Sequence, residues 1–297
     1  MAIFTGLSAF PITPADEQGR VDAGALRTLL RRLADAKVDS IGLLGSTGSY
    51  PYLSRSERRT AIEAAVDQVG GQAPILAGIG ALRTDDAVRF GQDAKVAGAD
   101  AVLLAPVSYT PLTDGEVFTH FEAVARAVDL PLCIYNNPGT THFTFGAELV
   151  ARLSHLPNVA AVKNPVPEAS AVPGHLRELR AMAAPGFSLG YSVDANAPEA
   201  MLAGGDAWYS VVGGLFPQLC MPIVAAARAG DAAEVRRLNE RLQPMWALFA
   251  EFSSLRVMYA AVNLLGICRA VPPRPILPLG AEAQRRIGDT LEALGLG

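Results

Sequence analysis

Short apolar runs alternate with amphipathic segments along most of the chain. Eight runs are rich in aliphatic and β-branched residues and are apolar throughout, as is typical of strands covered on both faces. Segments between them, such as VDAGALRTLLRRLADA, place apolar residues at steps of three and four, the spacing of one helix face. The runs span residues 6–12, 40–45, 74–80, 101–106, 131–136, 159–164, 187–191 and 208–214. This alternation predicts an α/β fold.

Helix boundaries can be expected from capping residues. Asp22, Ser54 and Asp114 each stand where a helix N-cap is expected, because their side chains accept hydrogen bonds from the first turn. Ser54 is followed three residues later by Glu57, the spacing of a capping box. Gly98 precedes an apolar run and fits a helix stop. These signals predict helices between the apolar runs.

About eight strand and helix units within some 220 residues predict a (β/α)₈ barrel, which typically needs about 250 residues. The alternative is a doubly wound sheet, which has fewer strands and a phosphate loop after the first strand. Here the first run is followed by TPADEQG, which lacks such a loop. We therefore expect a TIM barrel.

Strand signals end at the eighth run, and the remainder of the chain has helical spacing. AEVRRLNERLQPMWALFAEF and SLRVMYAAVNLLG are predicted amphipathic helices, and the Pro-rich VPPRPILPLG is too short to link domains. We expect a catalytic barrel over residues 1–221. Residues 222–297 are expected to form a C-terminal helical extension, packed on the barrel or on a neighbouring subunit.

Composition and charge narrow the possible partners. The chain has 297 residues, of which 50% are hydrophobic, enough for an extensive core. Its 25 basic and 29 acidic residues give a net charge of −4, and the basic ones are scattered. This distribution argues against nucleic acid or an anionic membrane as a partner.

Cysteine and histidine positions bear on compartment and metals. Three cysteines, Cys133, Cys220 and Cys268, lie far apart in apolar contexts, as expected of free thiols in a reducing cytoplasm. The N-terminus lacks the pattern of a secretory signal, and no apolar run approaches the roughly 20 residues of a membrane span. The four histidines show no metal-ligand spacing. We expect a cytoplasmic protein without a metal.

In a barrel of this kind the active site lies at the carboxyl ends of the strands. Polar residues at the ends of the apolar runs are therefore expected to converge on one pocket. They are Thr13, Ser46, Thr47, Ser108, Tyr109, Tyr135, Asn136, Lys163, Tyr191, Ser192, Asp194, Tyr209 and Ser210.

Lys163 stands out because it ends the apolar run in AAVKNP. Burial disfavours a charged amine, so a lysine surrounded by apolar wall can present a free amine that forms a Schiff base with a ketone. Tyr135, one strand away, is suited to proton transfer, and the GSTGS turn at residues 45–49 is suited to holding a carboxylate. From spacing alone a snorkelling lysine, a core tyrosine and an ordinary turn remain open.

GSTGS, LLAPVSYTP, IYNNPGTT and AAVKNP, in this order and with these separations, resemble the dihydrodipicolinate synthase and N-acetylneuraminate lyase family of class I aldolases. The resemblance extends from Phe4 to about Pro278. It implies a (β/α)₈ barrel with C-terminal helices, usually a homotetramer, and no cofactor beyond a covalent imine. By position, Lys163 matches the Schiff-base lysine, Tyr135 the catalytic tyrosine, and Ser46 and Thr47 the hydroxyls that bind the keto acid carboxylate.

The chain departs from the dihydrodipicolinate synthase pattern at four positions. Ser108 stands where those synthases have a relay tyrosine, unless Tyr109 substitutes for it, and Thr140 replaces an arginine that grips a second carboxylate. Ser49 replaces the glutamate of the loop, and Tyr209 replaces a small aliphatic residue. Because a hydroxyl cannot replace a bidentate guanidinium, recognition of the distal acceptor is expected to differ.

We therefore expect a Schiff-base lyase acting on a 2-keto acid such as pyruvate, either a pyruvate-releasing aldolase or a 2-keto-3-deoxy sugar acid dehydratase. The alternatives are dihydrodipicolinate synthase itself, which condenses pyruvate with aspartate semialdehyde, and a non-catalytic keto-acid-binding barrel. A homo-oligomer, either tetramer or dimer, is expected. The expected substrate-binding residues are Ser46, Thr47, Thr140, Ser192 and Tyr209.

Overall fold

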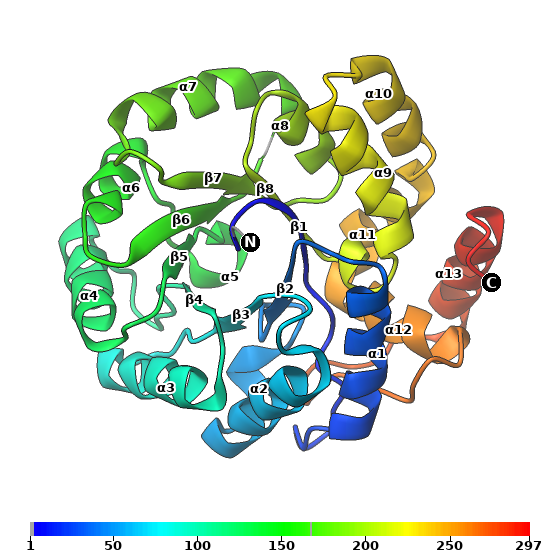
Figure 1. Cartoon of the computed structure of the whole chain (residues 1–297). Helices are drawn as coiled ribbons and strands as arrows, with labels where there is room; N and C mark the ends of the chain where they lie inside the picture. Colours follow the sequence, from blue (N-terminus) through cyan, green and yellow to red (C-terminus); the bar gives the residue numbers. More distant parts are fainter. Residues whose placement is uncertain (1–2, 167) are drawn as a thin grey trace.

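The computed structural model describes residues 3–166 and 168–297, and its eight strands form one closed, parallel barrel (Figure 1). Each strand pairs with the next in the chain, and β8 closes the barrel against β1. The strands are β1 Gly6–Ala9, β2 Ser40–Leu43, β3 Ile75–Gly78, β4 Ala101–Leu104, β5 Leu132–Tyr135, β6 Val159–Asn164, β7 Ser188–Tyr191 and β8 Ala207–Ser210. Each of the eight predicted runs overlaps a strand, so the predicted (β/α)₈ fold is confirmed.

Helices surround the barrel as an outer ring (Figure 1). Short 3₁₀ turns lie at Tyr50–Tyr52, Ala169–Ala171 and Val212–Gly214. The helices from β1 to the end of the ring are α1 Ala23–Asp35, α2 Arg55–Val69, α3 Thr84–Ala97, α4 Asp114–Ala127, α5 Pro138–Thr141, α6 Ala147–Ser154, α7 Val172–Met182, α8 Ala197–Leu202 and α9 Pro217–Arg228.

Most of the expected caps form. Asp22 accepts a hydrogen bond from the backbone N–H of Ala25, and Gly98 ends α3 with a φ of 95°. Ser54 accepts from the N–H of Glu57, but the Glu57 carboxylate accepts from the N–H of Val21 at 2.6 Å. Only half of that predicted capping box therefore forms, because Val21 supplies a competing donor.

The predicted cap of α4 was wrong by one residue. Thr113 is the N-cap and makes a complete capping box with Glu116, while Asp114 is the first helical residue. An acidic residue in the first turn also favours the helix, since it faces the positive end of the helix dipole. Because Thr113 and Asp114 are both good N-cap residues, the sequence alone does not fix where α4 begins.

The side chains inside the barrel form an apolar cluster that is separate from the core between the strands and the helices. The two ends of this inner cluster differ. Phe4 precedes β1, is buried, and its carbonyl accepts a hydrogen bond from Ser188 Oγ at 2.7 Å. Figure 1 shows the described segment just before β1 crossing the middle of the ring of strands. The amino end of the barrel is thus closed by Phe4, and the carboxyl end is left for polar side chains.

Glycines on the inner face of the barrel make room for two aromatic rings. A Cβ on Gly42 would lie 2.2 Å from the Phe10 ring, and one on Gly190 would lie 2.3 Å from Cε2 of Tyr209. The two rings meet edge to face, with centroids 6.0 Å apart. Phe10 and Tyr209 therefore fill the centre of the barrel only because β2 and β7 carry glycine there.

Gly190→Ala is expected to lower the free energy of unfolding by about 1–3 kcal/mol, because the added methyl group overpacks the barrel against Tyr209. Chemical denaturation measures this change. Gly115→Ala is the matched control, since nothing lies within 4 Å of a Cβ at that position. The double variant Gly190→Ala with Tyr209→Leu should recover part of the loss, and strictly additive losses would contradict this packing.

Four further helices follow the ring. They are α10 Ala232–Glu240, α11 Gln243–Phe252, α12 Ser254–Leu264 and α13 Ala281–Ala293. α10 packs against α8 and α9, and α13 packs against α11 and α12 (Figure 1). Residue 222 lies within α9, the last helix of the ring. Among the described residues, no helix has both the length and the apolar character needed to cross a membrane.

Candidate active site

Lys163 lies on β6 inside the carboxyl end of the barrel. Its Cα pairs with Tyr135 on β5 and with Gly190 on β7, and only 3% of the residue is exposed. Nζ lies 3.8 Å from the centroid of the Phe10 ring, 4.3 Å from that of Tyr135 and 5.8 Å from that of Tyr209. Aromatic faces attract a cation. Within the described chain, Lys163 has no carboxylate partner. The amine is therefore enclosed by rings.

The hydroxyl of Tyr135 belongs to a three-membered cluster. Tyr135 Oη lies 3.2 Å from Ser46 Oγ, and the side-chain amide of Asn137 donates to Tyr135 Oη at 2.9 Å and to Ser46 Oγ at 3.1 Å. We call Ser46, Tyr135 and Asn137 the hydroxyl–amide cluster. It joins the loop after β2 to the end of β5, next to Lys163.

The turn at residues 45–49 has the features of an anion nest. A Cβ on Gly48 would lie 3.0 Å from the backbone nitrogen of Leu44, so the turn is folded tightly on itself. Thr47 is buried, yet within the described residues neither its backbone N–H nor its hydroxyl has a hydrogen-bond partner. A backbone N–H without a partner in a buried residue is uncommon in native proteins. The two Thr47 donors fit a site for a carboxylate.

This turn is held from behind by the helical extension. Tyr259 on α12 donates its hydroxyl to the carbonyl of Thr13 at 2.9 Å and contacts Ser49 Oγ at 3.3 Å. Ser49 is fully buried and has a φ of 57°, an uncommon conformation for a residue with a side chain. The position of Ser49 therefore depends on packing against α12.

Thr140 and Ser192, two expected substrate-binding residues, lie at the edge of the site. Thr140 is exposed on α5 and donates its hydroxyl to the carbonyl of Asn137 at 3.3 Å. Ser192 follows β7, is half-buried, and donates its hydroxyl to the carbonyl of Asn164 at 3.2 Å. Whether these hydroxyls contact a substrate stays a prediction.

Tyr209, another expected substrate-binding residue, is buried in the barrel interior. The residue is 1% exposed, and its hydroxyl lies 3.6 Å from Cys133 Sγ on β5. Burial raises the pKa of the Cys133 thiol to about 12 and raises the pKa of Tyr209 well above its ordinary value. Both groups are therefore neutral near pH 7, and Tyr209 faces Lys163 with its ring.

The loop after β4, which contains Ser108 and Tyr109, places no hydroxyl against Tyr135 within the described residues. Ser108 Oγ donates to the carbonyl of Thr110 at 2.6 Å, and the side chain of Tyr109 is fully exposed to solvent in this chain. Neither makes a hydrogen bond to Tyr135 within the described residues. Within one subunit the hydroxyl–amide cluster is therefore completed by Asn137.

The expected convergence of every run-end polar residue on one pocket was wrong, not only for the exposed Tyr109 but also for Tyr191, Asp194 and Ser210. Tyr191 Oη meets His175 Nδ1 at 3.0 Å, and Ser210 Oγ contacts Cys220 Sγ on α9 at 3.6 Å. The Asp194 carboxylate accepts from Trp208 Nε1 and from the backbone N–H of Val212. Successive side chains of a strand point to opposite faces, so the neighbours of inward residues face the helices.

Asp194 has a structural role that follows from its burial. Desolvation raises the pKa of its carboxyl, and the hydrogen bonds donated by Val212 and Trp208 oppose that rise. These bonds tie the turn after β7 to the turn after β8. Asp194 therefore organises this rim without a contact to Lys163.

Phe10 and Asn137 are site residues that the sequence interpretation missed. Both follow a recognisable alternation, since Phe10 lies two residues after the inward-facing Ser8 and Asn137 lies two residues after Tyr135. A period of two places such residues on the same face of a strand. Following this alternation within the first run to Phe10, and one residue past the fifth run to Asn137, would have identified them.

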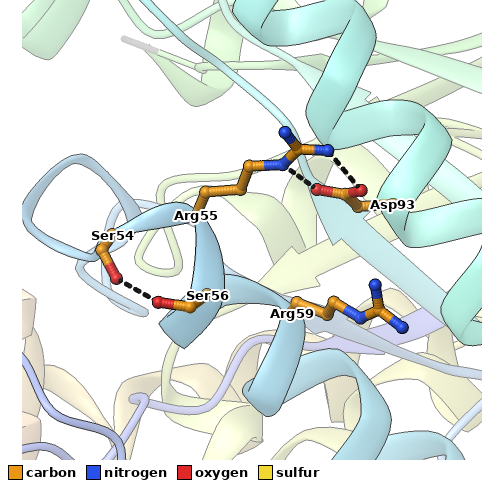
Figure 2. Close-up of a pocket in the computed structure, with 5 residues that line it drawn as sticks. All are labelled: Ser54, Arg55, Ser56, Arg59 and Asp93. Atoms are coloured by element: carbon orange, nitrogen blue, oxygen red, sulfur yellow. Dashed lines mark hydrogen bonds and ion pairs between the residues drawn. The ribbon is translucent and has the colours of Figure 1, made fainter.

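A second hollow, of about 460 Å³, lies at the surface between α2 and α3 (Figure 2). Its arginines are already paired: Arg55 binds both oxygens of Asp93, and Arg59 binds Glu63 at 2.6 Å. Surface pairs of this kind are weakly stabilising and leave little net charge. We assign no reaction to this hollow, since the amine and the hydroxyl–amide cluster lie elsewhere.

Comparisons with known proteins agree with one another. The model described as the Dihydrodipicolinate synthetase family matches residues 3–294. A curated 4-hydroxy-tetrahydrodipicolinate synthase from Alcanivorax borkumensis is 35% identical, with 96% of each chain covered, and one from Pseudomonas putida is 36% identical at the same coverage.

Solved structures give the same result. A crystal structure of a dihydrodipicolinate synthase from Agrobacterium tumefaciens is 56% identical, has a TM-score of 0.96 and covers 98% of each chain. A prophage protein of the dihydrodipicolinic acid synthase family from Escherichia coli K12, solved in complex with pyruvate, is 26% identical, has a TM-score of 0.92 and covers 100% of each chain.

Proposed function

The chain belongs to the dihydrodipicolinate synthetase family, as its motifs predicted, and we propose that it is a Schiff-base-forming lyase acting on a 2-keto acid. The observation that carries this proposal is the position of Lys163, whose buried amine lies between aromatic rings, one of them the ring of Tyr135. No cofactor is required, because the covalent imine on Lys163 supplies the electron sink.

The GSTGS turn is proposed to hold the keto acid carboxylate. The free N–H and hydroxyl of Thr47 are donors that an anion satisfies, and Ser46 lies next to them in the hydroxyl–amide cluster. Charge-assisted hydrogen bonds are the strong ones in proteins. With its carboxylate held here, the keto acid presents its C2 carbonyl to the neighbouring amine.

Imine formation uses Lys163 and Tyr135 together. The lone pair of Nζ attacks C2, a carbon–nitrogen bond forms, and the carbonyl oxygen takes up two protons and leaves as water. The product is a protonated imine. The Tyr135 hydroxyl, on the strand next to Lys163, is placed to move these protons.

Two outcomes follow from the same imine. In aldol cleavage the C4 hydroxyl gives up its proton, the C3–C4 bond breaks, and its electron pair enters the imine as an enamine. Protonation of C3 and hydrolysis then release pyruvate and free Lys163. In dehydration C3 gives up a proton to form the enamine, and the C4 hydroxyl leaves with a proton as water. The proposal covers both outcomes, since both use Lys163 and Tyr135.

Reductive trapping tests this function. Borohydride added with pyruvate is expected to attach the pyruvate carbon skeleton to Lys163, because reduction makes the imine bond permanent. Intact mass and a peptide map locate the adduct, and borohydride without pyruvate is the control. An unmodified protein would sink the Schiff-base proposal. Trapping without turnover of any 2-keto-3-deoxy acid would support a keto-acid-binding barrel instead.

A second candidate is condensation of pyruvate with aspartate semialdehyde, favoured because the curated relatives are 4-hydroxy-tetrahydrodipicolinate synthases. Against it, Thr140 offers an exposed hydroxyl where a second carboxylate needs a guanidinium. Loss of one such contact costs on the order of 1.5–3 kcal/mol. A coupled assay with turnover of about 1 per second or more would favour this candidate.

Assembly and location belong to the same proposal. We infer a homo-oligomer, tetramer or dimer, from family membership. The three cysteines are free thiols in the structure, and two of them are buried. Free thiols of this kind suit a reducing cytoplasm.

A further inference from the structure

We propose that Asn137 is a positioning residue for this reaction, one that orients the hydroxyls of Tyr135 and Ser46 and stabilises negative charge on the Tyr135 oxygen. The inference rests on the proposed lyase function. The loop after β4 brings no relay hydroxyl to Tyr135, and in its place Asn137 prepares Tyr135 for proton transfer.

The first observation is a helix cap that is not used. Asn137 is the N-cap of α5, and asparagine is among the residues that best cap a helix with their side chain. Here its side chain makes no capping bond. Only the backbone carbonyl serves the helix, by accepting from the N–H groups of Thr140 and Thr141 at 3.0 Å each. A residue that forgoes a local stabilising interaction, here the side-chain cap of α5, is typical of a functional site.

The second observation is where that side chain goes instead. Its amide donates to Tyr135 Oη at 2.9 Å and to Ser46 Oγ at 3.1 Å, and those two oxygens lie 3.2 Å apart. A carboxamide nitrogen carries two hydrogens and can donate to both oxygens, so the three side chains form a closed triangle. The amide holds the two hydroxyls against each other at the position next to Lys163.

The chemistry follows from what an amide can and cannot do. Its N–H groups donate hydrogen bonds but do not exchange protons as hydroxyls do. Asn137 therefore does not relay a proton. Because its N–H points at the Tyr135 oxygen, it favours the state in which that oxygen bears negative charge, and it leaves the Tyr135 proton for Ser46 or the substrate.

The third observation is the lack of a competing donor. Ser108 is bonded to Thr110, and Tyr109 points into solvent, so within the described chain the Tyr135 hydroxyl is bonded only to Ser46 and Asn137. Asn137 therefore provides, within the subunit, a hydrogen-bond donor to Tyr135 that the loop after β4 does not provide.

The test compares two variants of nearly equal size. Asn137→Leu removes both donors, and Asn137→Asp replaces them with acceptors that repel charge on the Tyr135 oxygen. We expect kcat to fall about 10- to 100-fold in the first and further in the second, the scale of one charge-assisted hydrogen bond. KM should change less than kcat, because Asn137 acts on the Tyr135 oxygen and does not hold the keto acid carboxylate.

Gly139→Ala is the matched control on the same helix, because a Cβ there would meet only Asn137 Oδ1 at 3.8 Å. It should keep wild-type kcat. Melting temperatures of the two Asn137 variants should fall by less than about 4 °C, since the side chain does not cap α5. If Asn137→Leu fails to fold, the polar Asn137→Asp variant carries the comparison.

A double-mutant cycle separates positioning from general damage. If Asn137 acts through Tyr135, adding Asn137→Leu to Tyr135→Phe should cost little more than Tyr135→Phe alone. Losses that multiply would overturn the inference, and so would an unchanged kcat in both single variants. Pyruvate trapping on Lys163 should persist in Asn137→Leu. Absence of trapping in the wild type would instead refute the lyase function itself.

Discussion

Lys163→Ala is expected to abolish pyruvate trapping and to lower turnover of the 2-keto acid substrate by about 10⁴-fold or more, the order observed when an enzyme loses its covalent nucleophile. No other amine replaces it, because Nζ lies inside a pocket formed by the rings of Phe10, Tyr135 and Tyr209. Steady-state kinetics and intact mass after borohydride measure the two effects.

The same substitution is expected to leave the fold intact. Lys163 is buried and has no carboxylate partner within the described residues, so its removal also removes a desolvated polar group. The melting temperature should stay level or rise. Lys95→Ala is the control, since that lysine is exposed and paired with Asp129 at the surface. Residual turnover within tenfold of wild type would rule out Lys163 as the nucleophile.

Tyr135→Phe is expected to lower kcat by about 10²- to 10⁴-fold, the usual contribution of a positioned acid or base. The ring stays in place and continues to enclose Lys163, while the hydroxyl that contacts Ser46 and Asn137 is lost. Trapping with pyruvate should become slower but should still reach Lys163, because the nucleophile is unchanged. Rapid-quench kinetics with borohydride measure the rate of imine formation.

Tyr191→Phe is the control for the loss of a buried phenol. Its hydroxyl contacts His175 on α7 and faces away from the barrel interior. This variant should retain wild-type kcat, with only a change in stability from the lost hydrogen bond. If Tyr135→Phe and Tyr191→Phe lose activity equally, the effect is structural and Tyr135 has no role in proton transfer.

Much of the fold was predictable because it depends on local composition. Each apolar run is long enough for a buried strand, and Gly98 and Ser54 mark the ends of helices through their own backbone and side-chain preferences. The exact cap at Thr113 was less certain, since Thr113 and Asp114 both suit the position. Boundaries between two good cap residues depend on the geometry of the preceding loop.

The candidate site was predictable in part. The motif order placed Lys163, Tyr135 and Ser46 at strand ends, and the register pairs Lys163 with Tyr135. The side-chain direction of Tyr191, Asp194 and Ser210 was not predictable from the ends of the runs. A shift of one residue along a strand turns a side chain from the barrel interior to the surrounding helices.

The sequence by itself determined the barrel and the family and pointed to Lys163 as the candidate Schiff-base lysine, because apolar runs, turns and motif order are properties of the chain. Only the tertiary structure decided that Phe10 lies against Lys163 and that Asn137 joins Ser46 to Tyr135. Those contacts link strands and loops that are far apart in sequence, and closing the barrel fixes which side chains meet.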